Sequence, residues 1–373
     1  MRARRLREVR SVTADVLVAG GGPAGAAAAA AARAEGLEVE LMDASGPHVP
    51  RPGESLPPGT EAVLDELFGT RGFQREHHRA AYGNRSAWGD AGLDAAEFML
   101  NPLGHGWHLD RRAFDASLLD SLRTKGVRVR EGTRVAQQSW TGDCWEVALD
   151  GGRSAVRARA IVDATGRAAR IARGQGARRR RLDRLVAAYW LLKAGNERKG
   201  DSTTLVEAVV DGWWYTTPAP AGGRVVAFLT DADLLPPRTT RTPRAWNERL
   251  ALAPRIREAL ADAGCRLHAG PRITDAAVAH LEQPAGPGWV AAGDAAVSFD
   301  PLSSQGIATA LLMGREAGRA VVAMLTRADP EPLVRYGAAY AALLEDHCRQ
   351  RAAYYGLERR WPSAPFWGRR DIE

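Results

Sequence analysis

The sequence predicts a mixed α/β fold: a Rossmann-like dinucleotide-binding domain, an interleaved antiparallel β-sheet substrate domain, and C-terminal helices. Three observations predict it. An apolar strand enters a glycine-rich turn at 20–25, two further strand-like segments end in short motifs at 161–166 and 289–294, and four strand-like segments lie between 187 and 230. A strand, glycine turn and helix in that order are typical of a dinucleotide-binding sheet. A chain of 373 residues suits two interleaved domains sharing a large core.

The first element is a strand, a turn and a helix that together form a phosphate-binding unit. Residues 14–19 supply the buried strand, and seven alanines at 26–32 begin the helix. Gly20 permits the tight turn, Gly22 lets the backbone approach a pyrophosphate, and Gly25 allows close packing of helix on strand. The free N–H groups of the helix N-terminus point at the phosphates. The candidate cofactor-binding residues here are Gly20, Gly22, Pro23, Ala24 and Gly25.

The second predicted strand, 38–42, ends at Asp43, which stands 23 residues past Gly20. An acidic residue at this distance is expected to accept hydrogen bonds from a ribose diol. The alternative for Asp43 is a cap on a helix or turn. These two elements predict a dinucleotide but do not distinguish FAD from NAD.

The motifs in the C-terminal half of the chain distinguish FAD from NAD. A strand ending in Gly293 and Asp294 leads through a loop at 300–305 into a predicted helix at 306–325. The N-terminus of that helix would stabilise negative charge that develops on a reduced isoalloxazine ring. The order of the three motifs therefore predicts a flavoprotein.

With these motifs in place, the chain resembles the FAD-dependent aromatic monooxygenase family, the p-hydroxybenzoate hydroxylase type of fold. The resemblance implies that Gly293 and Asp294 reach the ribityl and phosphate region. It identifies 111–115 with the family's R-x-x-F-D element and 51–55 with its R-x-G-E-S segment. The further cofactor-binding residues that it implies are Arg51, Ser55, Arg111, Asp163, Gly166, Pro301, Ser304, Gln305 and Gly306.

The same reasoning divides the chain into three parts. We predict strands at 187–192, 203–210, 213–217 and 225–230, one helix near 244–261, and a hairpin around 150–152. The predicted FAD-binding domain comprises 12–80, 103–180 and 285–330, the substrate-binding domain 81–102 and 182–284, and the C-terminal helical cover 331–373.

Residues 212–218, G-W-W-Y-T-T-P, resemble the flavin-dependent halogenase motif G-W-x-W-x-I-P. Halogenases also need a lysine between the G-E segment and the substrate sheet, and this chain has no lysine before Lys125. Ser303 stands where tryptophan halogenases carry a glutamate. The tryptophan pair Trp213 and Trp214 is therefore interpreted as a wall that keeps water from the flavin. Buried strand aromatics are the alternative.

A closer resemblance comes from segments 86–89, 101–111, 300–307 and 354–367. Together they resemble the flavoproteins that mature tryptophylquinone enzymes by hydroxylating a tryptophan of a partner protein. The resemblance implies an FAD-dependent monooxygenase acting on a tryptophan in a peptide or protein. The candidate substrate-side residues are Trp107, Trp213, Trp214 and Tyr215.

Hydroxylation of this kind uses O2, which reduced flavin traps as a C4a-hydroperoxide, so that the cofactor carries the difficult step. The protein must position the indole and remove a proton from the adduct. His105 and His108 are the candidates for proton transfer, and Glu54 is the alternative. Each could instead be structural. NAD(P)H is expected to reduce the flavin directly or through a partner flavin reductase.

The amino-acid composition limits the classes of partner that the protein is expected to bind. Of the 51 basic residues 48 are arginine, and the runs 2–10 and 178–181 are interpreted as solvated arms. The alternative is an Arg-rich docking surface for the partner. No nucleic-acid partner, membrane span or metal site is expected, and three scattered cysteines fit a cytoplasmic location. The competing functions are hydroxylation of a free small aromatic compound, reduction of isoprenoid double bonds, and non-catalytic binding.

Overall fold

We describe the protein from a computed structural model. The described residues are 12–45, 52–69, 72–98, 101–150, 155–193, 195, 202–236, 242–327 and 331–370. The α-helices are α1 (Pro23–Ala34), α2 (Thr60–Phe68), α3 (Arg111–Thr124), α4 (Arg170–Gly174), α5 (Pro243–Leu250), α6 (Pro254–Asp262), α7 (Gly306–Arg327), α8 (Glu331–Leu357) and α9 (Pro365–Gly368).

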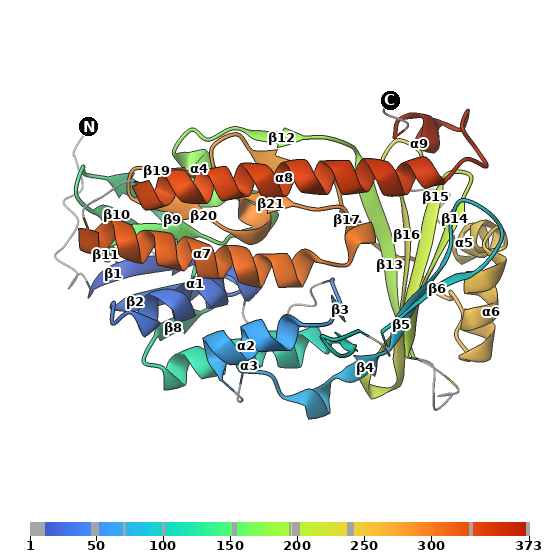
Figure 1. Ribbon diagram of the computed structural model, residues 1–373, viewed down its shortest axis with the longest axis horizontal. Coiled ribbons are helices and arrows are strands. Elements are labelled where there is room, and N and C mark those ends of the chain that lie inside the picture. The colour runs from blue at the N-terminus through green and yellow to red at the C-terminus, as the bar shows by residue number, and fades with distance from the viewer. Residues whose placement is uncertain are drawn as a thin grey trace.

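The first sheet is mainly parallel and lies at the left of Figure 1. Its strands are β1 (Val12–Ala19), β2 (Val39–Asp43), β8 (Arg128–Glu131), β9 (Val135–Trp140), β10 (Trp145–Leu149), β11 (Ala155–Asp163), β19 (Ala285–Gly286) and β20 (Trp289–Ala291). The order is β19-β20-β11-β1-β2-β8, and β10 joins β11 antiparallel to form the predicted hairpin. The strands after which the three motifs follow, β1, β11 and β20, are therefore neighbours in this sheet.

Helices α1 and α7 cross at very short range. A Cβ at Gly314 would lie 2.1 Å from the Ala24 carbonyl oxygen, and one at Gly318 would lie 2.6 Å from that of Ala28. Only glycine on α7 and small residues on α1 permit this approach. The alanine run 26–32 thus serves contact between the helices, and it also brings the N-termini of α1 and α7 to one side of the sheet.

The second sheet is antiparallel apart from one strand pair and lies at the right of Figure 1. Its strands are β5 (Gly83–Ala87), β6 (Asp94–Glu97), β13 (Leu185–Lys193), β14 (Thr203–Val209), β15 (Gly212–Ala219), β16 (Gly223–Asp231) and β17 (Arg272–Asp275), in the order β17-β13-β16-β15-β14-β5-β6. The four predicted strands are confirmed. The single predicted helix is instead α5 and α6, because Pro254 begins a new helix at a position where its missing N–H is tolerated.

Two small sheets complete the fold. One joins β3 (Ser55–Leu56), β7 (Gly106–His108) and β4 (Arg79–Ala81), and the other joins β12 (Arg179–Arg181), β18 (Ala279–Leu281) and β21 (Val297–Ser298). The remaining elements are the 3-10 helices η1 (Arg75–His77), η2 (Gly166–Ala168), η3 (Pro220–Gly222), η5 (Gly293–Ala295) and η6 (Pro301–Ser303).

Helix α8 runs from the parallel sheet to the antiparallel one, where the chain ends near α9 (Figure 1). The predicted fold class is confirmed, whereas the residue boundaries of the domains remain a prediction. Within the described ranges, no helix has the length and apolar character to cross a membrane.

Candidate functional site

The glycine turn between β1 and α1 has the shape that a phosphate-binding turn requires. Gly20 has φ +119°, and a Cβ there would lie 2.0 Å from the Ala164 carbonyl oxygen. A Cβ at Gly25 would lie 1.9 Å from the Gly20 carbonyl oxygen. Gly22 is the N-cap of α1, and in the described chain no side chain caps this N-terminus and no acidic residue occupies its first turn. These N–H groups can therefore receive an anion.

Asp43 lies directly against this turn. A Cβ at Gly21 would be 2.8 Å from the Cβ of Asp43 and 3.0 Å from its Cγ. Its Oδ1 accepts the N–H of Ser45 at 3.4 Å, so Asp43 also caps the turn after β2. The structure thus brings Asp43 and the glycine turn together, as the spacing predicts. A contact between Asp43 and a ribose remains a proposal.

The third motif meets the first at Gly293, whose φ is +59°. A Cβ here would lie 2.7 Å from the Cβ of Ala24 on α1 and 3.5 Å from that of Ala310 on α7. The next residue, Asp294, has a side chain that is 49% exposed and an Oδ2 that lies 3.7 Å from the Nε of Arg167. Arg167 was not among our candidates, although it directly follows the motif 163–166.

Arg111 joins two more of the predicted segments. Its Nη1 donates to the carbonyl oxygens of Pro52 (2.8 Å) and Gly53 (3.0 Å), and its Nη2 pairs with Asp115 at 3.2 Å. A Cβ at Gly53 would lie 4.0 Å from the side chain of Ile307, at the start of α7. The R-x-x-F-D element, the R-x-G-E-S segment and α7 therefore converge. Arg51 lies outside the described residues.

Arg111 also carries an unused donor. Its Nε is buried and has no hydrogen-bond partner among the residues that the structure describes. A buried donor without a partner is costly, and an acceptor atom of a bound flavin would remove that cost. The residues present therefore fit FAD: a glycine cradle, an acid beside it, two helix N-termini and an unpaired guanidinium N–H. Of the predicted cofactor-binding residues at the start of α7, Pro301, Gln305 and Gly306 are exposed to solvent. Ser304 is half-buried and has φ +53°.

The second motif has a supporting role. The carboxylate of Asp163 is fully buried and accepts hydrogen bonds from the N–H and hydroxyl of Thr165 at 3.0 and 2.7 Å, and from the N–H of Ala172 at 2.9 Å. Both oxygens are thus engaged within the loop after β11. This corrects the interpretation of Asp163 as a direct cofactor contact. Gly166, with φ +64°, provides the left-handed conformation that turns this loop.

Strand β15 presents its aromatic residues on opposite faces, because side chains alternate along a strand. Trp213 and Tyr215 lie on one face, in the cluster that contains Tyr355 of α8. Trp214 faces the other way and packs on Trp190 (6.0 Å between ring centroids) and Phe228 (5.0 Å) beneath α5 and α6. The expected wall of two tryptophans is therefore wrong for Trp214, which packs in a different cluster from Trp213 and Tyr215.

This correction makes a prediction. Trp214→Phe should lower stability by about 1–3 kcal/mol, because it removes buried volume, and should leave FAD binding and substrate turnover unchanged. The indole Nε1 of Trp214 has no hydrogen-bond partner within the described chain, so no bond is lost with it. Denaturant unfolding and steady-state kinetics of the two proteins would check this. A lowered turnover with normal FAD content would restore Trp214 to the site.

Glu54, Ser55 and Tyr215 converge between β3 and β15. The Ser55 and Tyr215 hydroxyl oxygens are 3.5 Å apart. Burial raises the pKa of Glu54, while the nearby charge of Arg111 opposes the rise. Burial, and then the negative charge of Glu54, raises the pKa of Tyr215 well above its ordinary value, so its hydroxyl stays protonated. The site therefore pairs a carboxyl of raised proton affinity with a phenolic hydrogen-bond donor.

His108 is buried and lies behind this pair. Its Nε2 is 3.4 Å from the carbonyl oxygen of Ser202, and its Nδ1 is 2.9 Å from the hydroxyl oxygen of Thr217. A carbonyl only accepts, so Nε2 carries the hydrogen and Nδ1 accepts from Thr217. Being 1% exposed, His108 has no free nitrogen for an indole, which corrects its interpretation as a direct proton acceptor.

His105 and His78 are also held by packing. His105 donates from Nδ1 to the Gly106 carbonyl oxygen at 2.9 Å, and its ring contacts Tyr82 and Trp107. Trp107 is itself buried. His78 is half-buried and stacks on Phe73, and burial lowers its pKa to about 4. The structure therefore leaves Glu54 as the candidate proton acceptor.

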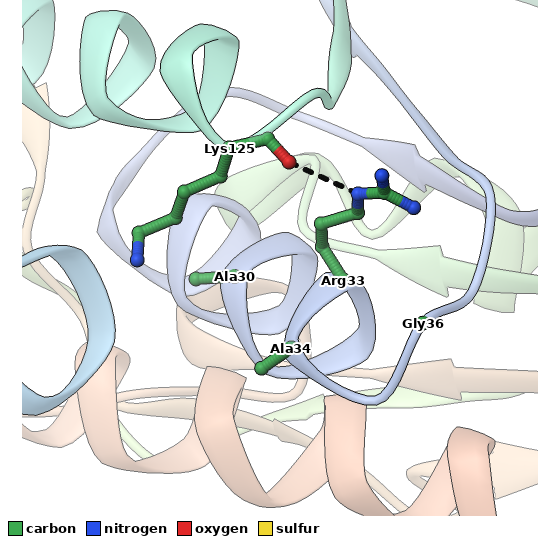
Figure 2. A pocket seen from close by; sticks show the side chains of 5 residues that line it. All are labelled: Ala30, Arg33, Ala34, Gly36 and Lys125. Atoms are coloured by element: carbon green, nitrogen blue, oxygen red, sulfur yellow. Dashed lines mark hydrogen bonds between the residues drawn. The ribbon is translucent and has the colours of Figure 1, made fainter.

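The described lysines lie away from this pair. Lys125 ends α3 and lines a depression with Arg33, Ala34 and Gly36, where Arg33 donates to the Lys125 carbonyl oxygen at 3.0 Å (Figure 2). This depression is at the C-terminal end of α1, about 18 Å along the helix axis from the glycine turn. Lys193 ends β13. Lys199 lies outside the described residues.

The arginine run 178–181 is not an arm, although the side chains of Arg178, Arg180 and Arg181 are exposed to solvent. It forms β12, and Arg178 and Arg180 both pair with Glu282. Arg179 is half-buried and donates to the Ser298 hydroxyl at 2.6 Å. Acidic and polar neighbours thus already engage this run, and it gives no support to docking of an acidic peptide. The run 2–10 lies outside the described residues.

Comparison with known proteins agrees with this geometry. Residues 15–180 match the family model described as FAD dependent oxidoreductase. A protein described as the FAD-dependent oxidoreductase LodB of Marinomonas mediterranea is 26% identical over 95% of this chain and 96% of its own length. The tryptophan 2-halogenase of Chondromyces crocatus is also 26% identical, over 79% of this chain, which spans 58% of that protein.

Solved structures share the fold. The chondrochloren halogenase CndH superposes with a TM-score of 0.85 and 24% identity, over 97% of this chain and 86% of that one. The peptidyl tryptophan dihydroxylase QhpG, essential for tryptophylquinone cofactor biogenesis, superposes with a TM-score of 0.79 and 24% identity, over 96% and 79%. Together with the glycine cradle and the unpaired arginine donor, these matches indicate an FAD-dependent enzyme that is similar to FAD-dependent oxidoreductases and has the fold of the flavin-dependent halogenase structures.

Proposed function

We propose that this enzyme hydroxylates the indole of a tryptophan held in a peptide or protein. The observation that carries the proposal is the convergence of Glu54, Ser55 and Tyr215 on the face of β15 that is turned toward the cofactor segments. A halogenase needs an ammonium group between the G-E segment and this sheet. In the described part of the chain a phenol and a carboxyl stand there instead.

The comparisons support this choice. LodB and this chain match over nearly their whole lengths, and QhpG is a peptidyl tryptophan dihydroxylase. Among the halogenase relatives, the tryptophan 2-halogenase has a large further part that this chain does not match. Halogenation is the second candidate, because several relatives and structural neighbours are halogenases.

Each residue has a defined part in the proposed reaction. FAD, when reduced and bound, supplies the activation of O2. As the new C–O bond forms on the indole, the proton on the same ring carbon must leave, and Glu54 is placed to accept it. Tyr215 donates a hydrogen bond that orients the indole or its oxygenated product, and Trp213 restricts the access of water. Arg111 and the N-terminus of α7 hold the cofactor.

The test is co-expression with the small tryptophan-containing proteins encoded beside its gene, followed by intact mass measurement and fragmentation. We expect one or more oxygen atoms on a single tryptophan. The Glu54→Gln enzyme serves as the matched control and should leave the partner unmodified while retaining FAD. A parallel culture supplied with bromide tests the second candidate.

Two other outcomes would overturn the proposal in different ways. A brominated tryptophan would establish a halogenase. An unmodified partner, combined with NAD(P)H oxidation on adding free indoles or phenols to the FAD-loaded enzyme, would establish hydroxylation of a small aromatic compound.

A further inference from the structure

A buried hydrogen-bond chain connects the proposed substrate face to the C-terminal helix. The indole Nε1 of Trp213 donates to the hydroxyl oxygen of Tyr355 at 3.1 Å. That hydroxyl donates in turn to Oδ2 of Asp300 at 3.0 Å. The three side chains belong to β15, to α8 and to the segment that leads into α7, and each is at most 3% exposed.

The direction of this chain is fixed by chemistry. An indole N–H can only donate and a carboxylate can only accept, so the Tyr355 hydroxyl must accept from Trp213 and donate to Asp300. No other arrangement satisfies both neighbours. Such a chain in a buried environment holds its members in one geometry, because rotation of the hydroxyl would leave two buried polar groups without partners.

Asp300 connects the hydrogen-bond chain to the segment that leads into α7. Its Oδ1 accepts the N–H of Leu302 at 3.0 Å and so caps η6. Its Oδ2 also accepts from Nε of Arg351 at 3.1 Å, and the other end of that guanidinium pairs with Asp183 at 2.8 Å. The carboxylate therefore anchors the start of the segment 301–306, which contains four of the cofactor-binding residues that the family resemblance implies.

Tyr355 differs from the other buried tyrosines of α8. Tyr336 and Tyr340 donate to backbone carbonyl oxygens of the parallel-sheet region, at 2.6 and 2.7 Å. Tyr355 alone of these three bonds to a carboxylate and to a side chain of β15. The end of α8 is also held in place, because Trp88 donates to the Tyr354 carbonyl oxygen at 2.8 Å.

We infer that Tyr355 is a positioning residue. It fixes the segment 301–306 relative to the substrate face of β15, so that the flavin ring and the indole meet at a set separation. This inference rests on the proposed function for the identity of the two surfaces that it joins. Through this hydrogen-bond chain α8 connects β15 of the antiparallel sheet to the segment that leads into α7.

The experiment compares Tyr355→Phe with Tyr340→Phe in the FAD-loaded protein. Both remove one buried phenol hydroxyl from the same helix, so both should lower the unfolding temperature. Only Tyr355→Phe should shift the visible absorption bands of the flavin and raise the FAD dissociation constant, by about tenfold. It should also release more hydrogen peroxide per NAD(P)H oxidised. Asp300→Asn should reproduce these changes, and the double variant should add little to them.

The outcomes separate the inference from the function on which it rests. Wild-type flavin bands and FAD affinity in Tyr355→Phe would overturn the positioning role, whatever the substrate. A partner that the wild-type enzyme leaves unmodified would overturn the proposed function, and the flavin measurements would still test the position of 301–306. If Tyr355→Phe does not fold, Trp213→Phe, which removes the donor of the chain together with part of a buried ring, should give the same band shift, and the absence of that shift would refute the inference.

Discussion

Replacement of Gly22 by valine should give a folded protein that binds no FAD. Gly22 has φ −77° and ψ −178°, an extended conformation that any residue adopts, so the substitution introduces no backbone strain at this position. The new side chain would stand at the N-cap of α1, where the pyrophosphate must approach the free N–H groups. A loss of this contact should lower FAD affinity by at least about a hundredfold.

The absorption spectrum of the purified protein, taken with its far-ultraviolet circular dichroism, measures both halves of this prediction. Ala34→Val is a suitable control, because it adds the same side chain at the exposed, opposite end of α1. Gly20→Val would be a poor test, since φ +119° and the nearby Ala164 carbonyl oxygen would compromise folding. Stoichiometric FAD in the Gly22→Val protein would refute the phosphate-binding assignment of the turn.

Glu54→Gln should abolish most hydroxylation while FAD remains bound. If Glu54 accepts the proton of the indole ring, its loss should lower the rate of product formation by about a hundredfold or more. Reduced flavin would still consume O2, so hydrogen peroxide should replace product. Glutamine keeps the size of the side chain, and its amide oxygen can still accept the Gly53 N–H that Glu54 Oε1 binds at 3.1 Å.

The pH dependence follows from the raised pKa of Glu54. The carboxylate is the active form of the base, so the rate should fall as the pH drops through this pKa. Because burial raises the pKa, the fall should occur at higher pH than the ordinary value of 4.5 would give. The acid limb should disappear in Glu54→Gln. Glu97→Gln, at an exposed position on β6, should retain the wild-type profile. An unchanged acid limb in Glu54→Gln would assign the proton transfer to another group.

Much of the cofactor side follows from the sequence. The steric requirement at Gly25 comes from the Gly20 carbonyl oxygen, so the short motif contains it, whereas the requirement at Gly20 comes from Ala164, after the neighbouring strand β11. The position of Asp43 relative to the glycine turn follows from the lengths of one helix and one strand. The antiparallel strands were predicted because each is a continuous apolar segment between turns. These features depend on local geometry, which nearby residues specify.

The substrate side was decided by tertiary structure. Alternation along β15 separates Trp213 from Trp214, but the sequence does not say which face meets the cofactor segments and which meets α5 and α6. His108 is removed from direct chemistry by Thr217, a residue 109 positions away. Tyr355 is joined to Trp213 across 142 positions. Such pairings depend on how two sheets and α8 pack together, and no local pattern records that packing.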